Sequence, residues 1–260
     1  MSLRAEQVEY AYAAGRPVLR GVSAKFAAGA VTALLGPNGS GKSTLLRLLL
    51  GTLSPQAGRC EIGGEATAGL SAKARGVRLA FVPQRPTVWA PFKVREVVAM
   101  GRHAQRRDDG AVDAALFAME LSDRVEEPFG TLSVGQQQRA ALARVLAQVA
   151  DERPGETRAI LADEPVAALD PRHALAALAA LRAEAARGLA VVVVLHDLAL
   201  AARYADRAVL LTDRGTVDGG GDAPAEEVLV PERLARVFGT GFRHVERLEA
   251  VGGTTLAGGV

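Results

Sequence analysis

The chain has 260 residues, enough to bury a core in one large domain or two closely joined ones. Its 31 basic residues nearly balance 29 acidic ones, and the formal charge of +2 gives no indication of nucleic-acid binding. A single cysteine, Cys60, excludes an intrachain disulfide framework and indicates a reducing compartment.

The N-terminal residues 1–7 carry no apolar core, so we expect no signal peptide. Residues 1–30 alternate in polarity and are interrupted at Gly15–Pro17 and Ala28–Gly29, which predicts antiparallel strands. The strongest apolar run, Leu189–Leu195, is far shorter than the roughly 20 residues that cross a bilayer. We therefore expect a soluble chain that reaches a membrane only through a partner.

A glycine-rich loop follows Val31–Leu35, a short apolar run that predicts a buried strand. The loop fits the spacing G-x-x-x-x-G-K-[ST] of a phosphate-binding loop. Leucines then continue to a predicted helix end at Gly51. Strand, loop and helix together point backbone N–H groups at an anion. The residues expected to hold a nucleoside triphosphate are Gly36, Pro37, Asn38, Gly39, Ser40, Gly41, Lys42, Ser43 and Thr44.

Two side chains of this loop have separate expected roles. Lys42, one of only four lysines, supplies a compact ammonium group for the β- and γ-phosphates. Ser43 places a hydroxyl on Mg²⁺. The alternative is a glycine-rich turn without a ligand. Such a turn would not require the complete G-x-x-x-x-G-K-[ST] spacing that this loop has.

The middle of the chain changes from strand to helical patterns. A buried strand is predicted at Leu79–Val82, ending at Pro83–Gln84. Apolar spacing then predicts helices at Val94–Met100, Ala111–Leu121 and Val134–Val149.

Strands alternate with helices on both sides of this helical region. The sequence therefore predicts an α/β fold in one domain, with a P-loop NTPase core and N-terminal antiparallel strands. Residues 1–85 and 151–260 would form the nucleotide-binding core, and residues 86–150 an inserted helical subdomain.

A predicted strand at Ala159–Ala162 runs directly into Asp163 and Glu164. Ligands gather at the carboxyl ends of parallel strands, so both carboxylates are expected beside the phosphates. Asp163 would hold Mg²⁺, and Glu164 would be the general base or orient the water that attacks the γ-phosphate. The alternative is an acidic turn at a strand end.

Further elements follow. A helix is predicted over Pro171–Arg187, then a strand at Val191–Leu195 and another at Ala208–Thr212. A helical pair is expected around 224–238, and the residues from Gly252 onward are expected to be frayed.

Six segments, in order, resemble the motifs of ATP-binding-cassette (ABC) ATPases over essentially the entire chain. Ser133 alone would be an ordinary helix N-cap, but its neighbours complete the pattern. The segments are the glycine loop, Pro83-Gln84, Leu132–Gln136, Ala159–Glu164, Ala168–Asp170 and Val194–Asp197. The resemblance implies a homodimer whose two copies bind head to tail and enclose two ATP molecules.

The resemblance also implies roles for individual residues. Ser133, Gly135 and Gln136 of one copy would bind the γ-phosphate held by the other copy's loop. Asp170 would help to order that opposing loop at the dimer interface.

Three further roles concern the nucleotide itself. Gln84 would touch Mg²⁺ or the attacking water, and His196 would contact the γ-phosphate. An aromatic ring ahead of the loop would stack on adenine, with Tyr12 the better match and Tyr10 the alternative.

Two positions depart from the family pattern. Val134 stands where the family usually has a second glycine, and its β-branched side chain would narrow the approach to phosphate. Val166 stands where the family often has threonine. Both departures concern rate more than function.

A subgroup resemblance concerns segments 83–102 and 222–239, which are similar to importer ATPases for iron-siderophore, haem or cobalamin. The loop 148–158 resembles haem importers in particular. The resemblance implies two permease subunits, indirectly a solute-binding protein, and a place at the cytoplasmic face of the inner membrane.

Segment 86–105, with Trp89 and Phe92, would receive the permease's coupling helix; alternatively, Trp89 packs within the helical subdomain. The histidines His103, His173 and His244 show no ligand spacing and are expected to be solvated or structural.

Other functions remain as alternatives. The chain could serve another ABC transporter, or act outside transport in translation or DNA repair, where two cassettes or a long coiled-coil insertion are usual. A binding module without turnover is disfavoured by Glu164 and His196.

Overall fold

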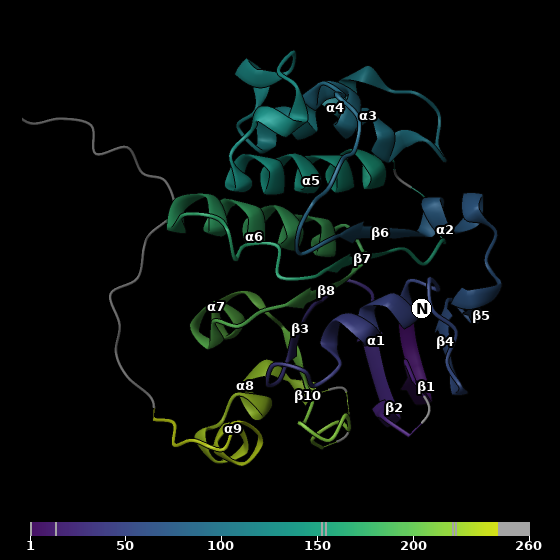
Figure 1. Ribbon diagram of the computed structural model, residues 1–260, viewed down its shortest axis with the longest axis vertical. Helices are drawn as coiled ribbons and strands as arrows, with labels where there is room; N and C mark the ends of the chain where they lie inside the picture. Colours follow the sequence, from purple (N-terminus) through teal and green to yellow (C-terminus); the bar gives the residue numbers. More distant parts are fainter. Residues whose placement is uncertain are drawn as a thin grey trace, which may run out of the picture.

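Two sheets form the frame of the molecule in a computed structural model that describes residues 2–13, 15–151, 153, 155–219, 221 and 223–243 (Figure 1). The larger sheet has the strand order β10-β9-β3-β8-β7-β6. Neighbouring strands from β9 to β6 are parallel, and β10 is antiparallel to β9. Its strands are β3 (Val31–Leu35), β6 (Leu79–Val82), β7 (Ala159–Ala162), β8 (Ala190–Val194), β9 (Arg207–Leu210) and β10 (Ala223–Pro224).

The smaller sheet is antiparallel, with the order β2-β1-β4-β5. Its strands are β1 (Ser2–Ala11), β2 (Pro17–Ala27), β4 (Ala57–Ile62) and β5 (Glu65–Ala66). The helix α1 (Lys42–Leu49) lies against this sheet, and four of its leucines are fully buried in a core shared with one face of the larger sheet. This core holds the start of α1, and with it the glycine loop, in place.

A second core lies on the other face of the larger sheet. Alternate residues of each parallel strand point to the two faces, so Ala33 and Val193 lie in this core while Leu34 and Val192 lie in the first. The helices that supply the second core are α3 (Val94–Ala99), α4 (Asp109–Ala118), α5 (Val134–Val149), α6 (Pro171–Ala186), α7 (Leu198–Tyr204), α8 (Ala225–Val228) and α9 (Pro231–Phe238).

The helices α3, α4 and α5 gather at one end of the molecule, beyond α6, and α5 lies next to β6 (Figure 1). All three were predicted, although α4 begins and ends two to three residues earlier than the apolar spacing indicated. That residues 86–150 form a separate subdomain stays a prediction.

The predicted fold class is confirmed, and every predicted strand is present within one or two residues of its expected bounds. The elements that sequence analysis missed are β4, β5, α2 (Ala72–Arg78), α7 and β10. These are short or exposed on one side, and their apolar patterns are correspondingly weak. The expectations for His244 and for Gly252–Val260 lie outside the described residues.

In the part of the chain that the structure describes, no helix combines the length and the apolar character needed to cross a bilayer.

Candidate active site

The glycine loop connects the carboxyl end of β3 to the first residue of α1. Gly36 has φ of 146°, and a Cβ atom there would lie 2.3 Å from the carbonyl oxygen of Leu211. Gly41 has φ of 97°, and a Cβ atom there would lie 2.6 Å from a methyl group of Leu19. Only glycine fits either position, because both the backbone conformation and the space exclude a side chain.

Lys42 is buried at the centre of this loop. Its Nζ donates hydrogen bonds to the carbonyl oxygens of Gly36 (2.8 Å) and Pro37 (2.9 Å). Burial lowers the pKa of Lys42, and the nearby charges of Glu164 and Asp163 oppose that shift. The ammonium group therefore lies inside the loop with few anionic partners, in a position to meet phosphate oxygens.

Asp163 follows β7 directly and is buried. Its Oδ1 atom has no hydrogen-bond partner among the described residues. Burial raises the pKa of Asp163, while interaction with the Ser43 hydroxyl opposes this shift. A buried carboxylate oxygen without a donor fits a site that a divalent cation completes.

The described residues contain no group of three or more His, Cys, Asp or Glu side chains able to hold a metal ion. Ser43 and Asp163 offer two oxygen ligands, and Mg²⁺ commonly takes the rest from substrate phosphates and water. These residues therefore fit a magnesium ion that arrives with the nucleotide.

Glu164 is held by two other predicted site residues. Its Oε2 accepts a hydrogen bond from Nε2 of Gln84 (2.8 Å), and its Oε1 lies 2.6 Å from Nε2 of His196. Gln84 follows β6, Glu164 follows β7 and His196 follows β8, and these three strands are neighbours in the sheet. Their carboxyl ends bring together three side chains that lie far apart in the sequence.

The backbone of Glu164 has φ of 49°, in the left-handed region that non-glycine residues rarely adopt. Such conformations cost about 1–3 kcal/mol and concentrate at functional sites. Asp197, the residue after His196, fixes the loop between β8 and α7. Its Oδ1 accepts hydrogen bonds from the N–H groups of Ala199 and Leu200 at the start of α7. Sequence analysis missed this cap, which an Asp directly before an apolar helix would have indicated.

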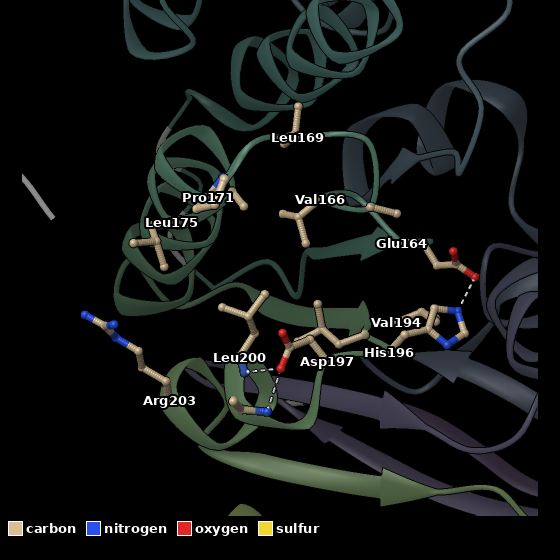
Figure 2. Close-up of a pocket in the computed structure, with 14 residues that line it drawn as sticks. Glu164, Val166, Leu169, Pro171, Leu175, Val194, His196, Asp197, Leu200 and Arg203 are labelled. Atoms are coloured by element: carbon tan, nitrogen blue, oxygen red, sulfur yellow. Dashed lines mark hydrogen bonds and ion pairs between the residues drawn. The ribbon is translucent and has the colours of Figure 1, made fainter. Parts of the chain in front are cut away.

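Figure 2 shows Glu164 and His196 pointing toward each other at one end of a cavity of about 460 Å³. Most of the residues that line the cavity are apolar, among them Leu175 of α6 and Leu200 of α7. The carboxylate–imidazole pair is therefore bordered by apolar surface on this side.

Ser133, Gly135 and Gln136, which were predicted to bind the other copy's γ-phosphate, lie at the start of α5. The Ser133 side chain accepts a hydrogen bond from the Gln136 N–H (3.3 Å), and the Gln136 side chain accepts one from the Ser133 N–H (2.9 Å). This is a capping box. Val134 is 66% exposed, so its extra bulk points into solvent and does not distort the turn.

A second cap lies beside the first. Asp170 caps α6 by accepting a hydrogen bond from the His173 N–H (3.0 Å), and its other oxygen lies 2.6 Å from Nδ1 of His173. Ser133, Gly135, Gln136 and Asp170 all line a hollow of about 410 Å³. No residue of the glycine loop is in this lining, so the structure brings the predicted site residues together as two separate groups.

The two candidate adenine-stacking rings pack edge to face, with their centroids 5.1 Å apart. Tyr12 is exposed, and its hydroxyl lies 3.2 Å from Oγ1 of Thr44 in the loop. Tyr10 packs against the apolar core of the smaller sheet. The geometry favours Tyr12 as the stacking ring and Tyr10 as its support. The Arg47 guanidinium, which the sequence analysis did not single out, donates a hydrogen bond to the Tyr12 hydroxyl.

Trp89 is 97% exposed, so the expectation that it packs within the helical subdomain is wrong. Phe92 is also partly exposed on the same segment. His103 and His173 contact backbone or side-chain oxygens within their own turns, in agreement with a structural role.

Comparison with known proteins gives consistent results. The model of the ABC transporter family matches residues 19–167. The chain is 45% identical over 232 residues to "Hemin import ATP-binding protein HmuV" of Pseudomonas fluorescens strain Pf0-1, covering 86% of this chain and 88% of that protein. It is also 45% identical over 229 residues to the protein of the same name from Nocardia farcinica, covering 86% and 76%.

A solved structure described as a dimeric bacterial ABC transporter cassette is similar with a TM-score of 0.75 and 27% sequence identity. The match covers 86% of this chain and 98% of that structure.

Proposed function

The chain belongs to the ABC transporter family and is an ATPase, and we propose that it is the subunit that powers import of haem through a partner permease. The single observation that carries the catalytic part is the fixed carboxylate of Glu164, next to the buried Lys42 and Asp163. The proposed cargo rests on the names of the relatives, which are described as hemin import proteins. Iron-siderophore and cobalamin are the alternative cargoes.

ATP would bind with its phosphates in the glycine loop and its adenine on Tyr12. The Lys42 ammonium, which now donates to Gly36 and Pro37, would turn to the β- and γ-phosphate oxygens. Ser43 and Asp163 would hold Mg²⁺, which neutralises charge on the phosphates when bound.

Glu164 would act on the attacking water. The water oxygen attacks the γ-phosphorus, its proton passes to the Glu164 carboxylate, and the bond to the β–γ bridging oxygen breaks to release ADP. His196 and Gln84 each hold one oxygen of that carboxylate, so its orientation is set before ATP arrives. When ATP is bound, His196 would turn from Glu164 to the γ-phosphate.

A second copy of the chain would complete the site. The hollow lined by Ser133, Gly135, Gln136 and Asp170 lies apart from the chain's own loop and presents a helix N-terminus. N-terminal N–H groups favour an anion, so this hollow suits the γ-phosphate bound by the partner copy. The similarity to a dimeric cassette supports this arrangement.

The proposed assembly has two copies of this chain, two permease subunits and, indirectly, a solute-binding protein. The chain would lie at the cytoplasmic face of the inner membrane, held there by the permease. Trp89 and Phe92 are exposed together next to α3, and we propose this segment as the permease contact.

Phosphate release by purified protein tests the catalytic assignment. Glu164→Gln should lower kcat about 10²- to 10⁴-fold while ATP binding persists, because the amide cannot accept the proton. The control Glu232→Gln, which changes an exposed glutamate on α9, should leave kcat unchanged. Wild-type turnover in Glu164→Gln would reject Glu164 as the base.

The cargo is tested separately in liposomes that contain the chain and the permease that co-purifies with it. ATP hydrolysis should rise when the solute-binding protein carries hemin, and the same binding protein loaded with cobalamin or a ferric siderophore should give no rise. If only cobalamin or only the ferric siderophore raises ATP hydrolysis, that compound is the cargo and the proposal of haem is rejected.

A further inference from the structure

Three polar side chains of α5 occupy the free edge of β6. Among the described strands, β6 pairs only with β7, so every second carbonyl group of β6 points away from the sheet. Three side chains of α5 donate hydrogen bonds to these backbone oxygens. Gln148 Nε2 donates to Leu79 (3.0 Å), Arg144 Nη2 to Phe81 (3.5 Å) and Gln138 Nε2 to Pro83 (3.3 Å). The acceptors are alternate residues, as the period of a strand requires.

The two elements run antiparallel and their lengths match. Gln138 and Gln148 are ten residues apart, about 15 Å along a helix. Their acceptors, Pro83 and Leu79, are four residues apart, about 13 Å along a strand. The set is therefore a continuous ladder of side-chain hydrogen bonds, not an isolated contact.

Gln138 occupies the end of this ladder nearest to the active site. Its side chain is 1% exposed, and its Nε2 donates to the Pro83 carbonyl. The Val82 carbonyl, one residue earlier, accepts from the Asp163 N–H on the β7 side (2.9 Å). The chain leaving β6 is thus held by α5 on one side and by β7 on the other.

The next residue is Gln84, whose amide donates to Glu164. We propose that Gln138 is a positioning residue: by fixing the Pro83 carbonyl to α5, it sets where the Gln84 side chain lies relative to Glu164. The first residue before α5 is Ser133, on the hollow assigned to the partner's phosphate. Movement of that end of α5 is then passed through Gln138 to the carboxylate that acts on water.

This inference rests on the proposed role of Glu164, and its test uses a double-mutant cycle in ATP hydrolysis. Gln138→Met keeps the length of the side chain and removes the donor. We expect kcat to fall about 10-fold with KM for ATP unchanged, because a small misplacement of a catalytic group is costly. The matched control is Gln148→Met, which removes the donor at the far end of the same ladder and should lower stability but not kcat.

The decisive comparison is made in a Gln84→Ala background. If Gln138 acts through Gln84, adding Gln138→Met should lower kcat no further there, although it should lower the free energy of unfolding as much as in the wild type. A purely structural role would lower kcat by the same factor in both backgrounds, and that result would overturn the proposal. An equal loss of kcat in Gln148→Met would overturn it as well.

Gln138→Asn provides a second variant should the Met variant fail to fold. It keeps the amide and shortens its reach, so the same cycle with the same expected and contrary results applies. Failure of the proposed role of Glu164 can be distinguished from failure of the role of Gln138. Full turnover in Glu164→Gln rejects Glu164 as the base, whereas loss of turnover there with additive effects in the cycle rejects only the role of Gln138.

Discussion

At the scale of single residues, the active site is assembled from charges whose burial is unfavourable. Burial moves the pKa of Lys42 down and that of Asp163 up, which means that each ionised side chain is destabilised by its surroundings. Glu164 adds a left-handed backbone conformation. Binding of Mg²⁺ and triphosphate would supply the missing opposite charges. The free protein is therefore less stable than it would be with these charges paired.

Asp163→Asn should therefore stabilise the free protein. Replacing a carboxylate whose charge is disfavoured by burial should raise the free energy of unfolding by about 1 kcal/mol, and the Tm by about 2–4 °C. The same change removes a ligand of Mg²⁺, so hydrolysis should be lost. Thermal unfolding without nucleotide, together with phosphate release, checks both parts; a lower Tm would contradict the assignment of Asp163 as a ligand whose charge is destabilised by burial.

At the scale of elements, two helix N-caps face one hollow. Ser133 caps α5 and Asp170 caps α6, and each uses its side chain to accept a hydrogen bond from the third N–H group of its helix. The same atoms that begin the helices would thus be presented to a partner's phosphate. Ser133 and Asp170 would each both cap a helix and contact the partner's phosphate. A helix cap elsewhere in the chain, which has only the first role, separates the two effects.

Ser133→Ala should lower the free energy of unfolding by about 1 kcal/mol, the usual cost of losing a serine cap. It should also lower the rate of hydrolysis, since the hydroxyl is assigned to the γ-phosphate. The matched control is Ser71→Ala, because Ser71 caps α2 in the same way by accepting from the Ala74 N–H. Equal effects of the two changes on kcat would show that Ser133 acts only as a cap.

Asp170 makes the cap of α6 dependent on pH. The backbone hydrogen bond from His173, followed by its side-chain hydrogen bond, lowers the pKa of Asp170 from its ordinary value of 3.8. A lowered pKa in the folded state means that the stabilisation is present above that ordinary value and is lost as the pH falls through the folded value.

Asp170→Ala should accordingly lower the Tm at neutral pH, and the difference from the wild type should shrink as the pH falls below the ordinary value of 3.8 and through the lower folded value. Asp170→Asn should keep much of the cap but lose its pH dependence. Thermal unfolding from neutral to acidic pH checks this. A difference between Asp170→Ala and the wild type that is constant over this range would contradict the linkage.

At the scale of the whole molecule, the residues of the proposed reaction fall into two groups that one chain does not join. One group consists of the glycine loop with Asp163, Glu164 and His196. The other consists of the residues that line the hollow at the starts of α5 and α6. The distribution is explained if two chains associate head to tail, so that each hollow closes over the partner's loop.

ATP should therefore control the oligomeric state. Glu164→Gln with Mg²⁺ and ATP should sediment as a dimer, because nucleotide is bound and not hydrolysed, and ADP should leave it monomeric. Analytical ultracentrifugation with each nucleotide measures this. Monomers at saturating ATP would contradict the composite site.

Most of the fold and of the first group of site residues could be predicted from the sequence, because their signals are local. The glycine loop has a fixed spacing set by phosphate geometry, and the parallel strands β3, β7 and β8 are buried at every residue. Short elements such as β4 and α7 were missed, since β4 is exposed over its first half and α7 is mostly exposed or half-buried, which leaves too few apolar positions to form a pattern.

By itself, the sequence determined the family, the phosphate-binding loop and the order of the parallel strands and longer helices along the chain. The tertiary structure alone decided that Gln84 and His196 both hold Glu164, that Trp89 is exposed, and that Gln138 ends a ladder on β6. The physical reason is that these contacts depend on which strands are neighbours in the sheet and where α5 lies along its edge. Such long-range placement results from packing of the whole core and leaves no periodic trace in the sequence.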